Sequence, residues 1–286
     1  MHFLQVTPIK ISQHLAVTII MSPRVCVLGA GIIGLSCAVR LQEVLGHRCL
    51  ITVVADKFGK ETTSAIAAGC FRPQDAAPVS GYTGRRSAVG KDIVLLSYNQ
   101  YTSILHSEEA EEAGVHKLTG YHIRYPLVGK EPFYATFLEK CRKLSESEIL
   151  SVFPSLPHGC SGHLLTTLVV SPNKYMPWLA KRFISNCGKS IKRRVESFCE
   201  MWDEYDIIVN CTGLSAGQLT GDPSIVPSRG QVMRVDNSSG KHTFAYIDNG
   251  TERMPYYIWT PDYTVIGGTK LIGCTDSRVS KMTMTL

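Results

Sequence analysis

The 286-residue sequence lacks the features of several specialised protein classes. A transmembrane helix needs an apolar run of about 20 residues, and no such run occurs, so no transmembrane helix and no membrane association are expected. Its ten cysteines form no Cys-x-x-Cys pair and match no Cys/His zinc spacing. They are therefore expected to be reduced structural thiols of an intracellular protein, and no metal site is predicted. Despite a formal net charge of +6, the basic residues form no long cluster, so no nucleic-acid partner is expected.

Residues 1–20 also lack the pattern of a secretory signal. Pro8, Lys10, Gln13 and His14 interrupt the apolar residues, and no continuous apolar core precedes a small-residue cleavage site. Met21 stands just before the first glycine-rich motif. Residues 1–20 are therefore predicted to form an extension outside the fold.

A strand–helix–strand pattern is present next to this extension. Residues 25–28 form a short apolar run, residues 32–45 have helical apolar spacing, and residues 50–55 form a second apolar run. This order predicts a βαβ unit with parallel strands. Farther along, we expect a loop over 76–92, helices over 92–106, 145–152 and 174–187, and strands over 120–125 and 205–213. The stretches "GQVMRVD", "PYYIW" and "YTVIGGT" predict strands of a mostly antiparallel sheet.

The turn between the first strand and helix reads Gly29-Ala-Gly31-Ile32-Ile33-Gly34. In this G-x-G-x-x-G pattern, the first glycine permits a tight turn, the second lets a pyrophosphate approach, and the third lets helix and strand pack closely. Asp56 stands at the end of the next strand, near the spacing of about 20 residues at which a carboxylate can bind a ribose hydroxyl. The context predicts a dinucleotide site, and the motif leaves open whether the ligand is NAD or FAD.

Residues 61–73, "ETTSAIAAGCFRP", add a second candidate element. The hydroxyls of Thr62, Thr63 and Ser64 can donate to phosphate or ribitol oxygens, and the small residues 67–69 let the backbone lie against a flat ring system. The alternative is a helix start with a Ser/Thr cap followed by small residues. These residues favour a flavin over nicotinamide, and so argue against an NAD-dependent dehydrogenase.

Several longer stretches carry a family resemblance. The sequences "RVCVLGAGIIGLS", "EAGVHKLTGY", "YMPWLAKR", "RRVESF", "YDIIVNCTGL" and "VIGGT" resemble the D-amino-acid oxidase family over residues 24–273. The resemblance is greatest to members that oxidise D-aspartate and D-glutamate. It implies FAD-dependent oxidative deamination of a D-amino acid by oxygen, which yields a 2-oxo acid, ammonia and hydrogen peroxide. Neutral D-amino acids remain an alternative substrate class, and a homodimer is considered.

The resemblance also implies an α/β fold with a Rossmann-like FAD-binding domain of discontinuous segments, 21–73 and 159–218. The substrate domain is expected to be α+β with a mostly antiparallel sheet, in segments 74–158 and 219–273, before an atypical tail, 274–286. The residues that the resemblance assigns to FAD are Gly29, Gly31, Ile32, Ile33, Gly34, Asp56, Lys57, Thr63, Ser64, Gly69, Cys70, Val195, Thr212 and Gly213.

For the substrate, the resemblance implies a tyrosine hydroxyl that binds a carboxylate. Tyr256 fits this position without a gap and Tyr257 with one, so both are candidates. Members specific for acidic substrates also use an arginine just before this strand. The aligned position lies near Ile247, and Arg253 is the nearest basic residue. This departure leaves the acidic or neutral preference open.

Two further family features are missing from the sequence. An Arg-Pro-x-Arg-like segment and a late "GHG" segment do not occur after Gly273. We therefore expect a truncated form that binds FAD poorly and turns over slowly or not at all. The family is commonly peroxisomal, but the chain ends Met284-Thr285-Leu286, which is not the import tripeptide, so a cytoplasmic location is the alternative.

Overall fold

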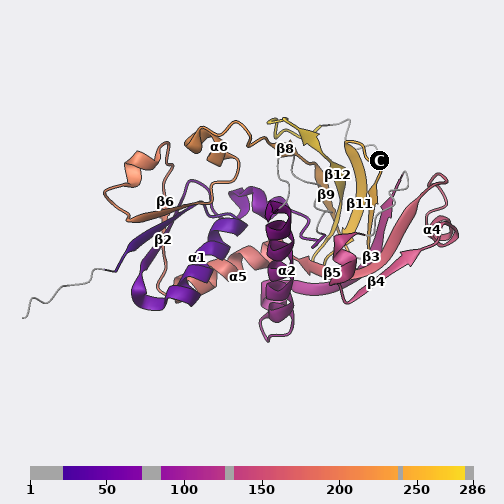
Figure 1. Ribbon diagram of the computed structural model, residues 1–286, viewed down its shortest axis with the longest axis horizontal. Helices are drawn as coiled ribbons and strands as arrows, with labels where there is room; N and C mark the ends of the chain where they lie inside the picture. Colours follow the sequence, from indigo (N-terminus) through magenta and orange to yellow (C-terminus); the bar gives the residue numbers. More distant parts are fainter. Residues whose placement is uncertain (1–21, 73–84, 126–131, 238–240, 281–286) are drawn as a thin grey trace, which may run out of the picture.

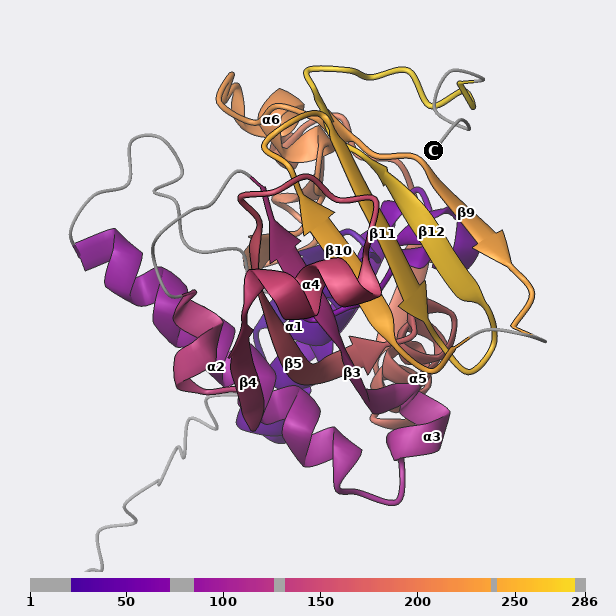
Figure 2. The same ribbon diagram turned by 90° about the vertical axis from the view of Figure 1, so that its right-hand side faces the viewer.

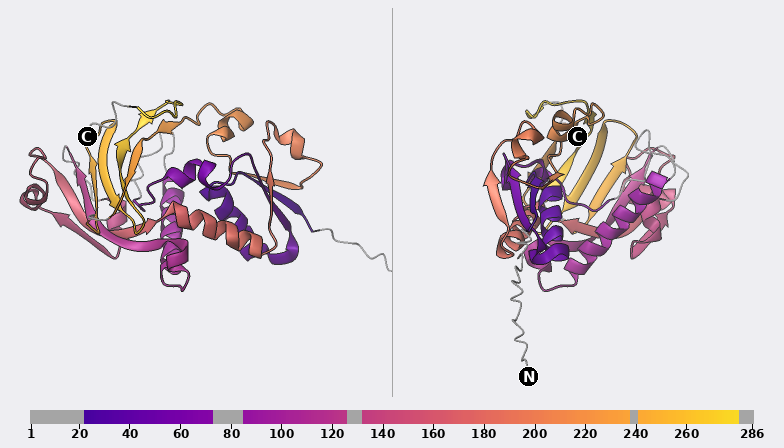
Figure 3. Two further views of the ribbon diagram at one scale, coloured as in Figure 1. Left: turned by 180° about the vertical axis from the view of Figure 1, so that it is seen from behind. Right: turned by 60° about the vertical axis from the view of Figure 1, so that its left-hand side comes forward.

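The computed structural model describes residues 22–72, 85–125, 132–237 and 241–280 (Figure 1). The predicted extension over residues 1–20 lies outside these ranges. Two sheets dominate the structure (Figures 1 and 3). One is a parallel sheet whose strands lie within residues 24–55 and 189–210, and the other is larger and mostly antiparallel. Within the described ranges, no helix has both the length and the apolar character needed to span a bilayer.

The four-stranded sheet has the order β6-β2-β1-β7, and all of its strands are parallel. The strand bounds are β1 (Arg24–Leu28), β2 (Leu50–Ala55), β6 (Lys189–Lys192) and β7 (Ile207–Asn210). The apolar β1 is central because it is flanked by β2 and β7, and Val27 is opposite both Val53 and Val209. The predicted parallel βαβ unit is therefore confirmed, and β7 arrives from a segment far along the chain.

Two helices, α1 (Ile32–Leu45) and α5 (Pro172–Ser185), pack together beside this sheet. Leu35 and Val39 of α1 and Trp178 and Phe183 of α5 belong to one buried apolar cluster with β1 and β2. In two opposite views, α5 runs from the large sheet toward the parallel sheet beside α1 (Figures 1 and 3). The shared core fixes the N-terminus of α1 above the end of β1.

The seven-stranded sheet has the order β4-β5-β3-β10-β11-β12-β9. Every neighbouring pair is antiparallel except β3 and β10, which are parallel. The bounds are β3 (Val115–Arg124), β4 (Lys140–Leu144), β5 (Ser161–Val170), β9 (Val232–Val235), β10 (Phe244–Asp248), β11 (Arg253–Trp259) and β12 (Thr264–Thr269). A parallel sheet together with a mostly antiparallel one confirms the predicted α/β fold class.

The large sheet has two differently covered faces. One carries Ile123 and packs against Ile149 of α4 (Glu146–Val152), which lies across the sheet in Figure 2. Ser145 begins α4 through a capping box with Glu148, as the sequence predicts for a serine at this position. The other face carries Leu118 and Phe244 and packs against η4 (Phe133–Thr136) and α2 (Arg85–Leu105).

One element begins earlier than the sequence predicts. Helix α2 starts at Arg85, so the expected loop over 76–92 is wrong for residues 85–92, and residues 76–84 lie outside the described ranges. A polar stretch that contains Gly90 is a poor helix candidate by propensity, but an isolated glycine costs only about 1 kcal/mol. The sequence pattern therefore places the helix start too late, at the first apolar residues.

The expected division into domain segments remains a prediction. Strand β5 falls in the segment 159–218, which is expected to belong to the FAD-binding domain, yet it pairs with β3 and β4 in the large sheet. The other described elements are short: α3 (Ala110–Ala113), α6 (Ser215–Thr220), β8 (Ser228–Arg229), β13 (Leu271–Ile272), η1 (Gly46–Arg48), η2 (Gly59–Glu61), η3 (Thr63–Ile66) and η5 (Phe198–Met201).

Candidate dinucleotide-binding site

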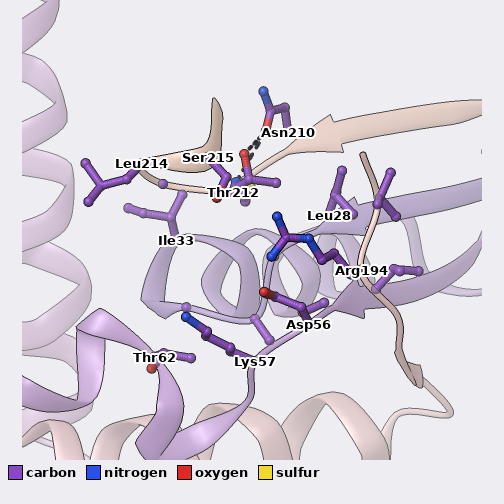
Figure 4. A pocket seen from close by; sticks show the side chains of 18 of the residues that line it. Leu28, Ile33, Asp56, Lys57, Thr62, Arg194, Asn210, Thr212, Leu214 and Ser215 are labelled. Atoms are coloured by element: carbon purple, nitrogen blue, oxygen red, sulfur yellow. Dashed lines mark hydrogen bonds between the residues drawn. The ribbon is translucent and has the colours of Figure 1, made fainter. Parts of the chain in front are cut away.

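A cavity of about 620 Å³ opens at the carboxyl ends of β1, β2 and β7 (Figure 4). This is where open parallel sheets bind ligands. The glycine-rich turn and the first turn of α1 form one side of the cavity. The other sides are formed by the end of β2, the stretch that enters η3, the stretch 193–196 after β6, and the stretch 210–219 around the end of β7.

The glycine turn is packed so tightly that side chains are excluded from two of its positions. Gly29 has φ +115°, and a Cβ there would lie 2.3 Å from the backbone oxygen of Cys211. A Cβ on Gly34 would lie 1.8 Å from the Gly29 oxygen. The Gly29 amide also donates to the Val54 oxygen at 2.8 Å. The first and third glycines therefore lock the turn against β2 and the end of β7, as the sequence motif predicts.

The N-terminus of α1 opens into the cavity. Gly31 is its N-cap and provides no side-chain cap, and the first turn carries no acidic residue. The hydroxyl oxygen of Ser64 accepts a hydrogen bond from the Ile32 amide at 3.0 Å. The other amides of the first turn have no intrahelical acceptor, because no helical residue precedes them by four positions. The helix dipole adds positive potential at this end. The arrangement suits a phosphate group.

Charged side chains lie at the other end of the cavity. Asp56 and Lys57 follow β2, and the guanidinium of Arg194 lies on the same side of the cavity as the Asp56 carboxylate (Figure 4). Hydrogen bonding to Glu196 is the main cause that raises the pKa of Arg194, with a smaller contribution from the charge of Asp56. The Arg193 amide donates to the Ala55 oxygen at 2.9 Å, which holds this stretch beside β2. A carboxylate at this place can accept from ribose hydroxyls.

Most residues predicted to bind the cofactor line this one cavity, although their contact with a cofactor remains a prediction. They are Gly29, Gly31, Ile32, Ile33, Asp56, Lys57, Thr63, Ser64, Val195, Thr212 and Gly213. Gly34 lies behind the turn. Gly69 and Cys70 lie beyond the cavity lining, against β5. The Gly69 backbone oxygen accepts a hydrogen bond from the Val170 amide at 2.8 Å, and Cys70 pairs with Val169 in an isolated antiparallel β-bridge. Burial raises the pKa of the Cys70 thiol to about 12.

The two candidate tyrosines lie on opposite faces of the large sheet, since they are consecutive residues of β11. Tyr256 stacks on Tyr246 of β10, with ring centroids 5.7 Å apart and planes 10° apart. Burial raises the pKa of Tyr256 to about 12, so its hydroxyl is a neutral donor at physiological pH. The Tyr257 hydroxyl donates to the backbone oxygen of Lys241. Of the two, Tyr256 has the hydroxyl that is available on the face that carries α2 and η4.

Sequence reasoning missed several cavity residues. Asn210 ends β7, and its side-chain oxygen accepts from the Thr212 hydroxyl at 2.7 Å and from the Thr212 amide at 3.3 Å, which shapes the turn into the cavity. Arg193 and Arg194 stand out in the sequence only as part of a short basic run. Nothing in the local sequence shows that these residues come next to Asp56, because parallel pairing of β6 with β2 brings them there.

The cavity fits a dinucleotide. It combines a glycine cradle that a Cβ would fill, a helix N-terminus without an acidic cap, and a carboxylate at the end of the second strand. Among the described residues, no group of three or more His, Cys, Asp or Glu side chains could hold a metal ion. The local chemistry is therefore that of binding a large anionic nucleotide by backbone amides and a few polar side chains.

Comparisons with known proteins agree with this geometry. A sequence model of the family described as FAD dependent oxidoreductase matches residues 24–284. The chain is 35% identical over 251 residues to D-aspartate oxidase of Homo sapiens, covering 87% of this chain and 69% of that protein. It is 29% identical over 249 residues to D-amino-acid oxidase of Rubrobacter xylanophilus, covering 86% of this chain and 69% of that protein.

Among solved structures, glycine oxidase from Geobacillus kaustophilus is similar with a TM-score of 0.62 at 16% identity, over 91% of this chain and 75% of that one. At this identity the match shows a shared fold. The sequence matches confirm the family resemblance drawn from the motifs.

Proposed function

Because this chain belongs to the FAD dependent oxidoreductase family, we propose that it is an FAD-dependent oxidase of D-amino acids with a preference for D-aspartate or D-glutamate. The observation that carries the cofactor assignment is the cavity at the end of β1, β2 and β7, where the glycine turn, the α1 N-terminus and Asp56 line one continuous space. Membership of the family supports FAD over NAD as the dinucleotide.

The chain's own residues have distinct roles in this proposal. The first-turn amides of α1 and the Ser64 hydroxyl hold the pyrophosphate, and the Asp56 carboxylate accepts from the adenosine ribose. The backbone at Thr212 and Gly213 lines the path between them. Tyr256 donates a hydrogen bond to a substrate carboxylate, for which a neutral phenol is suited.

Bound FAD would supply the redox chemistry, accepting a hydride from the substrate Cα and passing the electrons to oxygen to give hydrogen peroxide. The protein's contribution is orientation: the large sheet presents Tyr256 on the face next to the segment that leaves the cavity. The resulting imino acid hydrolyses in water to a 2-oxo acid and ammonia.

The preference for acidic substrates is supported by relatives. D-aspartate oxidase 1 of Caenorhabditis elegans is 31% identical over 241 residues, in addition to the human D-aspartate oxidase. A preference for neutral D-amino acids is the alternative, because D-amino-acid oxidases such as that of Streptomyces coelicolor, 27% identical over 245 residues, are also related. The two substrate classes are separated by direct comparison of turnover.

The cofactor part is tested by titrating FAD into the purified protein and following flavin fluorescence. We expect Asp56→Asn to weaken FAD binding about tenfold or more, since hydrogen bonds to a charged group contribute about 1.5–3 kcal/mol. Asp203→Asn is the matched control because Asp203 is exposed and does not line the cavity. Tight binding of NAD with none of FAD would contradict the assignment.

The reaction is tested on the FAD-loaded protein. Anaerobic addition of D-aspartate should bleach the flavin absorbance, and in air it should produce hydrogen peroxide. D-alanine should react more slowly, and L-aspartate should not react. Bound flavin that no D-amino acid reduces would refute the proposed reaction while leaving the cofactor assignment intact.

A further inference from the structure

A row of aromatic and imidazole side chains crosses four adjacent strands of the large sheet. His163 of β5 is opposite His122 of β3, His122 is opposite Tyr246 of β10, and Tyr246 is opposite Tyr256 of β11. Directly paired residues lie on the same face of a sheet. We call these four residues the aromatic row. It lies on the face that packs against η4, because the Tyr134 hydroxyl of η4 is hydrogen bonded to Nδ1 of His122.

Arg72 lies over this row. Its guanidinium carbon is 3.6 Å from the centroid of the Tyr246 ring, and its charge also influences His122 and Tyr256. The backbone before Arg72 is fixed to β5, because the Phe71 amide donates to the Leu168 oxygen at 2.8 Å. Arg72 is half-buried. Its stacking on the Tyr246 ring and the attachment of the neighbouring backbone to β5 keep its guanidinium over the row.

The charged groups on this sheet face include Arg72, Arg124 and Asp248, and the charges of Asp248 and Arg72 both reach the Tyr246 hydroxyl. Within the described ranges, no carboxylate forms an ion pair with Arg72, whereas most other described arginines pair with Asp or Glu. Burial and the charges of Arg72 and Arg124 keep His122 neutral by lowering its pKa to about 2. Arg124, the second arginine that acts on His122, already has an interaction partner. Arg72 is therefore a fixed cation, next to a neutral phenol, on a sheet face that can accept an anion.

The same segment of chain leads from the nucleotide cavity to this cation. Thr62, Thr63 and Ser64 line the cavity, and Arg72 follows Ser64 on the same short stretch. Arg234 of β9 donates to the Ala65 oxygen at 2.6 Å, which joins the large sheet to η3 at the edge of the cavity. The aromatic row is thus on the part of the large sheet that the segment reaches as it leaves the cofactor site.

We propose that Arg72 binds a carboxylate of the amino-acid substrate, together with the hydroxyl of Tyr256. The inference rests on the proposed function for the identity of the substrate. A guanidinium matches a carboxylate with two parallel hydrogen bonds, and a phenol hydroxyl adds a third donor. Both the α-carboxylate and the side-chain carboxylate of an acidic amino acid have this chemistry, and the experiment distinguishes them.

The first test measures binding without turnover. Malonate, a small dicarboxylate that cannot be oxidised by this reaction, is titrated into the FAD-loaded protein by calorimetry. Arg72→Gln should weaken malonate binding about 10- to 100-fold, the range for hydrogen bonds to a charged group. Arg72→Lys, which keeps a cation but loses the two-pronged geometry, should fall in between. Arg40→Gln is the control: it removes the same charge from an exposed arginine of α1, 71% exposed.

The second test compares kcat and KM for D-aspartate and D-alanine. If Arg72 binds the side-chain carboxylate, Arg72→Gln raises KM for D-aspartate alone. If it binds the α-carboxylate, KM rises for both substrates. Flavin absorbance and thermal unfolding check that each variant is folded. If Arg72→Gln does not fold, the comparison is made with Arg72→Lys, which keeps a cation over the Tyr246 ring.

Unchanged malonate affinity and unchanged KM for both substrates in Arg72→Gln would overturn the inference while leaving the oxidase assignment standing. Conversely, a protein that does not oxidise any D-amino acid but loses malonate binding on Arg72→Gln would refute the proposed function and keep the carboxylate site. A wild-type protein that does not bind malonate would overturn the site directly.

Discussion

Replacing Gly29 by alanine tests the geometry of the nucleotide cavity. At φ +115° an L-residue is strained by about 1–3 kcal/mol. The added Cβ would also lie 2.3 Å from the Cys211 oxygen and 2.7 Å from its carbonyl carbon, contacts that only a backbone shift can relieve. Overpacking of this kind costs about another 1–3 kcal/mol. The structure therefore predicts a loss of about 2–6 kcal/mol of unfolding free energy.

Gly221 provides a control for a positive φ without a steric clash. It is the C-cap of α6 with φ 69° and ψ 19°, and a Cβ there would have no atom within 4 Å. Alanine at this position should cost about 1–2 kcal/mol, the ordinary penalty of the left-handed region. The difference between the two variants, about 1–4 kcal/mol, measures the clash with the end of β7 together with the additional strain at φ +115°.

Thermal unfolding and FAD titration measure the two variants side by side. A difference of about 1–4 kcal/mol corresponds to roughly 2–16 °C in Tm for a chain of this size. The alanine at position 29 should also abolish FAD binding, because the shift of Cys211 moves Thr212 and Gly213, which line the cavity. Equal Tm values and equal FAD affinities for the two variants would refute the reasoning.

Two predictions concern the acid stability of the large sheet and of helix α4, which packs on it. Burial first, and then the charges of Arg72 and Arg124, lower the pKa of His122 to about 2. Below about pH 6.5 His122 is therefore protonated in the unfolded state and stays neutral in the folded state. Stability should fall by about 1.4 kcal/mol per pH unit as pH drops below about 6, and His122→Gln should flatten this slope in urea unfolding; equal slopes would contradict the burial argument. The Glu148 carboxylate, whose pKa is lowered to about 2 chiefly by the Ser145 amide, stabilises the fold above about pH 4.5. This stabilisation is lost as pH falls toward 2, and Glu148→Gln should remove that dependence in the same titration; a wild-type pH dependence that survives the substitution would refute it.

The nucleotide half of the site could be predicted from sequence because its signals are local. Gly29, Gly34 and Asp56 belong to one strand–helix–strand unit, and the apolar runs on both sides define the strands and the helix. Neighbours from far along the chain could not be predicted in the same way. The stretch around Arg194 reaches Asp56 only through the parallel pairing of β6 with β2, which no local pattern specifies.

The choice between Tyr256 and Tyr257 shows a second limit. Consecutive strand residues point to opposite faces, so a shift of one residue in register exchanges them. Sequence matching leaves both candidates open. The pairing of Tyr256 with Tyr246 and of Tyr257 with Ala245 decides which hydroxyl lies on the face with His122. Arg72 has no role that the sequence reveals. Its position over Tyr246 depends on the attachment of Phe71 to β5 and on the pairing of β5 with β3 and of β3 with β10.

The small residues before Arg72 have a reason that is independent of any ring system. A Cβ on Gly69 would lie 2.1 Å from the Val170 backbone oxygen, and the backbone of Cys70 pairs with that of Val169 in an isolated β-bridge. The backbone therefore has to lie directly against the end of β5 to carry the chain from Ser64 to Arg72. Since one end of this short segment accepts from the first amide of α1 and the other stacks on the large sheet, the cofactor cavity and the proposed carboxylate site are held in a fixed relation by the same backbone.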